Sequence, residues 1–201
     1  MKYKIPLLFV LVVVIITMHK AHGKKSTDTL GINRKLPNIY ENMGGDFKLT
    51  GPEGNEISSV SFRGKIILIY FGYTYCPDFC PMTLSYLNAV MIEIAELAKD
   101  VQVLFITIDP ERDTPEYLKE YVAYFHPKTI GLSGSLEQIK AIARAYRIYF
   151  AKAKEDDGAS DEYLLDHSSI TYLMGKDGKY LAHFSIGTSA EEIARRIRKY
   201  L

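Results

Sequence analysis

The sequence is poor in cysteine: Cys76 and Cys80 are the only two among 201 residues. So few cysteines exclude a disulfide-rich scaffold, and a spacing of four residues indicates one local site. A hydrophobic fraction of 47%, with fifteen tyrosines and nine phenylalanines, is enough for a packed core without disulfide support. The length suits a single domain with an additional tail.

A strong net charge of either sign is also lacking. The whole chain has a formal net charge of +1, and its first 23 residues contain three lysines and no acidic residue. The remainder is therefore close to neutral. We find no basic cluster of the kind that binds nucleic acid, and no glycine-rich fingerprint of a nucleotide-binding loop. We expect no nucleic-acid partner and no nucleotide cofactor.

The N-terminus contains an apolar run from Ile5 to Met18, preceded by two lysines. This run suits a cleaved signal peptide or a short membrane anchor, because about 20 apolar residues are needed to cross a bilayer. Both interpretations stay open, and both predict an exported protein that meets the membrane through this segment. The chain then divides into a signal or anchor over residues 1–23, a polar tether over 24–44 and a folded domain over 45–201.

Hydrophobic periodicity and turn residues predict the order of the elements within the domain. We expect hairpins at 46–60 and 170–184, buried strands at 65–71 and 101–108, a short strand at 149–151, and helices from Cys80, from Thr114, over 136–146 and from Ser189. Parallel strands that are joined by helices and closed by a late hairpin indicate the α/β class. We predict a thioredoxin-like fold, with an N-terminal β-hairpin and a central mixed sheet flanked by helices.

The two cysteines lie between the first buried strand and the helix that follows it. The carboxyl end of a strand is where α/β folds place chemistry, and a helix N-terminus favours the thiolate. A structural disulfide between Cys76 and Cys80 would close a very short loop and stabilise the protein by only about 2 kcal/mol. The other interpretations are a dithiol redox pair and a soft metal site. Thioredoxin-type enzymes separate their cysteines by two residues, whereas three residues separate this pair.

A metal site needs a further ligand, and His167 is the candidate that we favour among the five histidines. It lies in a predicted loop directly before the strand at 170–174, and in a thioredoxin-like fold this loop faces the cysteines. Thioredoxins carry a cis-proline there, but this chain has no proline after Pro127. We expect His126 to cap a helix end and His183 to pack within a strand.

Two sulfurs and one imidazole form a three-coordinate soft site, which suits one copper ion as Cu(I) or Cu(II). Structural zinc usually takes four ligands, so zinc is the less favoured metal unless Asp78, Asp109 or Asp166 adds an oxygen. The thioether of Met82 is also soft, but we expect it to pack in the core at the helix start. Oxidation of the cysteines to a disulfide would release the metal, so redox state is expected to control binding.

Several motifs occur together in the domain. They are YFGYT at 70–74, CPDFCP at 76–81, ITIDPERDT at 106–114, GLSG at 131–134 and DHS at 166–168. In combination they resemble the Sco/SenC family of copper-binding proteins that assemble cytochrome c oxidase. The resemblance covers roughly residues 38–201 and implies that copper is bound by Cys76, Cys80 and His167.

The resemblance also implies a partner and a compartment. The expected partner is subunit II of cytochrome c oxidase, or another copper-accepting protein. The chain would deliver copper to the binuclear copper centre of subunit II, or maintain the thiols there. Asp109, Asp78 and Asp166 are candidates for contacts with the ligands or the partner. The domain would lie on the periplasmic or mitochondrial intermembrane-space side, anchored in the inner membrane or released after cleavage.

We predict a metal carrier rather than an enzyme. The alternatives are a thiol–disulfide oxidoreductase or a peroxidase that acts through Cys76 and Cys80, and a redox sensor that binds copper without delivering it. An enzyme of either kind would tolerate the loss of His167, whereas a carrier would not.

Overall fold

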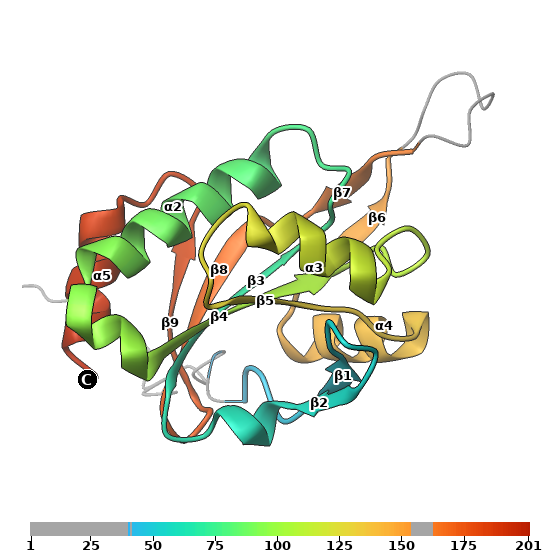
Figure 1. Cartoon of the computed structure of the whole chain (residues 1–201). Helices are drawn as coiled ribbons and strands as arrows, with labels where there is room; N and C mark the ends of the chain where they lie inside the picture. Colours follow the sequence, from blue (N-terminus) through green and yellow to red (C-terminus); the bar gives the residue numbers. More distant parts are fainter. Residues whose placement is uncertain (1–39, 41, 154–162) are drawn as a thin grey trace, which may run out of the picture. The chain divides into compact units, whose positions relative to one another are not determined.

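Figure 1 presents the computed structural model of the chain, which describes residues 40, 42–153 and 163–201. The predicted signal or anchor at 1–23, and most of the predicted tether at 24–44, lie outside the described residues. Among the residues that are described, we find no helix that is both long and apolar enough to cross a bilayer.

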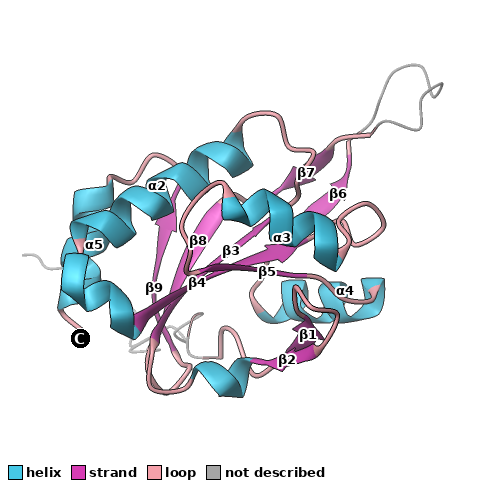
Figure 2. Cartoon of the chain, viewed as in Figure 1, coloured by secondary structure: helices cyan, strands magenta, loops and turns pink. Residues whose placement is uncertain are grey.

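The described residues form strands and helices that alternate in the middle of the chain, with strand pairs before and after that part (Figure 2). The strands are β1 (Lys48–Thr50), β2 (Glu56–Ser58), β3 (Ile66–Gly72), β4 (Val101–Thr107), β5 (Thr129–Leu132), β6 (Phe150–Lys152), β7 (Leu165–His167), β8 (Ile170–Met174) and β9 (Tyr180–Ser185). The α-helices are α2 (Phe79–Glu93), α3 (Pro115–Ala123), α4 (Leu136–Ala145) and α5 (Ala190–Arg198), and the 3-10 helices are η1 (Ser59–Phe62) and η2 (Ala95–Asp100).

The main sheet has five strands in the order β5-β4-β3-β8-β9. Strand β3 pairs in parallel with β4 and antiparallel with β8, so the sheet is mixed. Every residue of β3 and of β4 is buried, because helices cover both faces of the sheet. Strands that are buried on both faces have continuous apolar sequences, as these two do. The β1–β2 hairpin and the β6–β7 pair form separate two-stranded sheets.

Side chains of β3 alternate between the two faces of the sheet, as the period of a strand requires. Tyr70 lies on the face of α2, where its hydroxyl meets Cys80. Phe71 points to the opposite face and packs on Tyr146 at the end of α4, with ring centres 5.4 Å apart. Figure 1 shows α2 and α5 together on one side, and α4 beside the β1–β2 hairpin. The carboxyl end of β3 therefore leads directly to the helix that carries Cys80.

The predicted α/β class and thioredoxin-like fold are confirmed, but two elements differ from the sequence prediction. Strand β5 was not expected between α3 and α4, because its four residues include Gly131 and show no alternation. Glycine is needed there, since an added Cβ would lie 2.9 Å from the Cβ of Leu118 on α3. The predicted loop around His167 is in part strand β7, which forms through its pairing with β6.

Candidate metal centre

The cysteines are positioned by the end of β3 and the start of α2. We call residues 73–78 the cysteine loop; it contains Cys76, and Cys80 lies in the first turn of α2. An added Cβ at Gly72 would lie 2.7 Å from the Sγ atom of Cys80 and 2.8 Å from the ring of Phe105. Glycine at the end of β3 therefore allows α2 to bring its sulfur against the sheet.

Both cysteines are free thiols in a buried position. A hydrogen bond with the Cys80 thiol lowers the pKa of Cys76 to about 3, although burial acts in the opposite direction. The same hydrogen bond, together with burial, raises the pKa of Cys80. The pair therefore carries its first negative charge on Cys76, which is 8% exposed, whereas Cys80 is 0% exposed.

The imidazole of His167 approaches from the end of β7, where His167 is opposite Phe150 of β6. Its Nδ1 lies 3.2 Å from the carbonyl oxygen of Ser168. A carbonyl oxygen only accepts hydrogen bonds, so this contact assigns the ring proton to Nδ1. The lone pair of Nε2 is then free, and Nε2 lies 3.7 Å from the Sγ atom of Cys80. An Nδ1–H that donates to a backbone carbonyl is the usual support for a metal-binding histidine.

The donor atoms of Cys76, Cys80 and His167 all lie within 4.8 Å of one another. Ligands placed about 2.0–2.3 Å from one ion are about 3.5–4 Å apart in a trigonal arrangement, so shifts below about 1 Å per ligand suffice. No other cluster of three such side chains has this geometry in the described ranges. The donor set, two sulfurs and one imidazole, is chemically suited to a soft ion such as Cu(I).

Two tyrosines contact the candidate ligands from inside the protein. The Tyr70 hydroxyl lies 3.6 Å from the Sγ atom of Cys80, within reach for a hydrogen bond to sulfur. The Tyr73 ring is edge-on to the His167 ring at 5.8 Å between centres. Burial raises the pKa of both tyrosines, so they remain neutral phenols. Tyr70 and Tyr73 are themselves buried, so both pack against the candidate ligands from the protein interior.

The predicted acidic residues do not join the ligand group. Asp78 and Asp166 are exposed, and neither has a side-chain hydrogen bond or ion pair with any residue that the structure describes. Asp109 is 3% exposed and accepts hydrogen bonds from Arg112 Nε at 2.6 Å and from the Tyr163 hydroxyl at 2.7 Å. Asp109 is thus engaged within the protein, while Asp78 and Asp166 face solvent.

The remaining sequence candidates have simpler roles. The expectation for Met82 was wrong, because its side chain lies on the exposed side of α2 and the residue is 36% exposed. The Nδ1 atom of His126 accepts a hydrogen bond from the Lys128 N–H at 3.1 Å, in the segment after α3. His183 is half-buried in β9, and its Nδ1 lies 2.6 Å from the Tyr180 hydroxyl. His183 therefore lies in a strand as predicted, whereas His126 stabilises the turn beyond α3 and does not cap the helix itself.

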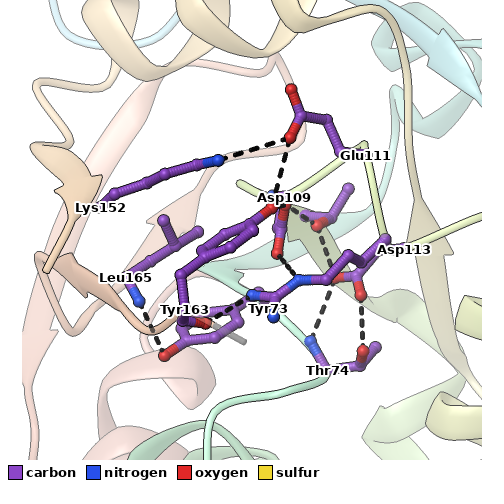
Figure 3. A network of polar contacts seen from close by, with 10 residues as sticks. Tyr73, Thr74, Asp109, Glu111, Asp113, Lys152, Tyr163 and Leu165 are labelled. Atoms are coloured by element: carbon purple, nitrogen blue, oxygen red, sulfur yellow. Dashed lines mark hydrogen bonds and ion pairs between the residues drawn. The ribbon is translucent and has the colours of Figure 1, made fainter. Parts of the chain in front are cut away.

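Sequence reasoning missed a buried polar network beside the metal centre (Figure 3). Asp113 is fully buried and accepts hydrogen bonds from the Thr74 N–H at 3.1 Å and the Thr74 hydroxyl at 2.5 Å. It also accepts one from the Thr107 hydroxyl at 2.6 Å, so it ties the cysteine loop to the end of β4. Burial raises the pKa of Asp113, and its hydrogen bonds oppose that shift. The signal in the sequence was an acidic residue one position before the helix cap Thr114.

Comparison with solved structures shows that the fold of this chain is similar to that of copper-bound proteins. The structure of Bradyrhizobium japonicum ScoI with copper bound is similar, with a TM-score of 0.72 and 39% identity over 79% of this chain and 99% of that chain. Yeast Sco1 with copper bound gives a TM-score of 0.70 and 33% identity over 80% of this chain and 91% of that chain.

Comparison of sequences identifies the family. A SCO2-like protein of Rickettsia felis is 45% identical over 159 residues, which are 78% of this chain and 77% of that protein. The human protein SCO1 homolog, mitochondrial, is 40% identical over 161 residues, which are 79% of this chain and 53% of that protein. The SCO1/SenC family model matches residues 37–201. On these grounds, and on the fold and the cysteine–histidine group, the chain belongs to the SCO1/SenC family.

Proposed function

We propose that this chain binds one copper ion as cargo and delivers it to the binuclear copper centre in subunit II of cytochrome c oxidase. Cys76, Cys80 and His167 are the proposed ligands. The observation that carries the proposal is that their donor atoms meet within 4.8 Å. The copper-bound structures of similar proteins support copper as the metal, and the family supports a role in oxidase assembly.

Transfer follows from the small number of ligands. Cys76 is the more exposed sulfur and the one with the lowered pKa, so its thiolate is the first donor that an incoming ion meets. Cys80 completes the set from the buried side and the half-buried His167 from the end of β7, with the ring proton held on Nδ1 by the carbonyl oxygen of Ser168. A three-ligand site leaves an open position, so a thiolate of the acceptor is able to bind before the donor sulfurs release the ion.

A second candidate function, reduction of the thiols of subunit II, is favoured by one specific observation. The pKa of Cys76 is lowered, whereas that of Cys80 is raised. This division gives one attacking thiolate and one buried thiol that resolves the mixed disulfide, which is the arrangement that thiol–disulfide exchange needs. The same pair of residues therefore supports both proposals, and only an experiment with the acceptor separates them.

The test uses the purified full chain and the soluble copper-binding domain of subunit II. Anaerobic titration with Cu(I) against a chromophoric chelator is expected to give one tightly bound equivalent. Mixing the loaded chain with the reduced acceptor should then transfer copper, and the His167→Ala variant should transfer none. If the reduced, metal-free chain restores acceptor thiols equally well with and without His167, while copper does not move, the carrier proposal is wrong and thiol reduction replaces it.

We also propose the cellular compartment and the segment boundaries that the sequence indicates. The apolar segment at 1–23 would place the protein at the inner membrane or direct its export, and 45–201 would be the copper-binding domain. The presence of mitochondrial relatives supports a compartment that is equivalent to the periplasm.

A further inference from the structure

The strand that carries His167 has no backbone pairing with the main sheet. Strands β6 and β7 form a separate two-stranded sheet, whereas the cysteine loop extends from β3 in the centre of the five-stranded sheet. Two residues of chain connect His167 to β8, which pairs with β3, so the backbone brings His167 near the cysteines. Side chains that reach from one segment to the other then set the distance between the imidazole and the two sulfurs.

Arg112 occupies the space between them. It lies in a turn after β4, in which the N–H groups of Arg112 and Asp113 donate to the carbonyl of Asp109 at 3.2 Å and 2.9 Å. Its side chain is 18% exposed and its Nε donates to the Asp109 carboxylate at 2.6 Å. One terminal nitrogen donates to the Tyr163 carbonyl oxygen at 2.9 Å. An arginine with these contacts is fixed in orientation, because its planar group is held at two edges.

Two aromatic rings pack against the guanidinium. Its central carbon lies 3.7 Å from the ring centre of Tyr163 and 4.5 Å from that of Tyr75. Tyr75 directly precedes Cys76, and Tyr163 leads into β7, which ends at His167. The Tyr163 hydroxyl also donates to Asp109, and these two side chains point toward each other in Figure 3. Arg112 thus contacts one residue beside each part of the metal centre.

We propose that Arg112 is a positioning residue that holds the His167 strand at ligand distance from the cysteine loop; this inference rests on the proposed copper site. A second link also joins β7 to the cysteine loop, since the Leu165 N–H on β7 donates to the Tyr73 hydroxyl at 3.1 Å. That link fixes one point of the strand, and Arg112 adds the contact needed to set its angle. Lysine does not replace arginine here, because it has no planar group that packs on aromatic rings while its edges donate hydrogen bonds.

The experiment compares Arg112→Ala and Arg112→Lys with Arg198→Ala in the full chain. Arg198 is a matched control, because it also donates to a backbone carbonyl and a carboxylate, both of Glu93, far along the chain from the ligands. Cu(I) affinity is measured anaerobically against a chelator, in the wild-type and His167→Ala backgrounds. Amide hydrogen exchange of the metal-free proteins is measured in parallel at 73–76 and 163–168.

Loss of Arg112 is expected to weaken Cu(I) binding about 10- to 100-fold, the usual effect of removing a group that supports a ligand. Arg112→Lys should show most of this loss in affinity, because lysine does not replace arginine here, and Arg198→Ala should show none of it. In the His167→Ala background the Arg112 effect should fall below about threefold, since the residue acts through the imidazole. Exchange at 73–76 and 163–168 should accelerate at least tenfold, with β3 and β4 still protected.

Unchanged exchange in Arg112→Ala would overturn the inference, whether or not the protein binds copper. Accelerated exchange without a loss of affinity would also overturn it, as would an equal loss in both backgrounds. If the wild-type chain binds no copper, the proposed function fails separately, and the exchange result alone then decides whether Arg112 holds the two segments together.

Discussion

Replacing Cys80 with serine is expected to weaken Cu(I) binding on the order of 10²- to 10³-fold. Four-ligand zinc sites provide the scale: about 10–16 kcal/mol is shared among four ligands, which is roughly 2.5–4 kcal/mol for each. A serine hydroxyl is a hard donor and does not replace a thiolate on Cu(I). Cys76→Ser should have an effect of the same size, because both sulfurs belong to one group. Competition with a Cu(I) chelator measures both variants.

Two controls separate metal binding from folding in these variants. Met82→Leu removes an exposed sulfur close in sequence to the pair and should bind copper as the wild type does. In Cys80→Ser the Tyr70 hydroxyl remains available to the new side chain, so the thermal unfolding transition should stay cooperative. A Cys80→Ser protein that folds and binds Cu(I) within about threefold of the wild type would exclude Cys80 as a ligand.

Asp113→Ala is expected to lower the free energy of unfolding by about 3–5 kcal/mol. The fully buried carboxylate accepts three hydrogen bonds, and its removal leaves the buried hydroxyl of Thr107 and the half-buried hydroxyl and N–H of Thr74 without an acceptor. Each unsatisfied buried group costs about 1–3 kcal/mol. The loss should also loosen the cysteine loop, which contains Thr74. Urea unfolding measures the stability change, and a loss below about 1 kcal/mol would contradict this role.

Asp113→Asn is the matched control, because it preserves the shape and the hydrogen bonds. The amide oxygen is able to accept from the Thr74 N–H and the Thr107 hydroxyl, while the amide nitrogen donates to the Thr74 hydroxyl. We expect this variant to lie within about 1 kcal/mol of the wild type at neutral pH, since a single hydrogen bond is reversed.

The difference in unfolding free energy between the wild type and Asp113→Asn should change with pH in a defined direction. Burial raises the pKa of Asp113, so the folded state binds the proton more tightly than the unfolded state does. The protonated carboxyl contributes its full stabilisation below the ordinary pKa of about 3.9. That stabilisation is lost as the pH rises through the raised pKa that Asp113 has in the folded protein. The unfolding free energy of Asp113→Asn should therefore gain on that of the wild type as pH rises from about 4 to 8. A gap that moves the other way would contradict the raised pKa.

The fold was predictable because its main elements have local signals. The apolar runs of β3 and β4, the turn between β8 and β9, and Thr114 before Pro115 are all readable from neighbouring residues. Strand β5 is not, since a four-residue segment with a glycine becomes a strand only by pairing with β4. Strand β7 is not either, because its partner β6 lies at a distance along the chain that periodicity does not detect.

The candidate ligands were predictable from residue type, spacing and the absence of a proline near His167. The residues that hold these ligands in place were not predictable. Arg112 and Asp113 occur in a motif that also reads as an ordinary turn and helix start, and the rings that pack against Arg112 come from two separate segments. The exposed position of Met82 was missed because the helical pattern from Cys80 assigns it neither clearly to the core nor to the surface.

The most direct measurement is copper K-edge X-ray absorption on the reduced chain loaded with one equivalent of Cu(I), alongside His167→Ala. Bound copper in the native protein should have two sulfur neighbours and one imidazole nitrogen, and the variant should lose the nitrogen and keep both sulfurs. A spectrum without sulfur, or an imidazole signal that survives the substitution, would show that the ion is held elsewhere.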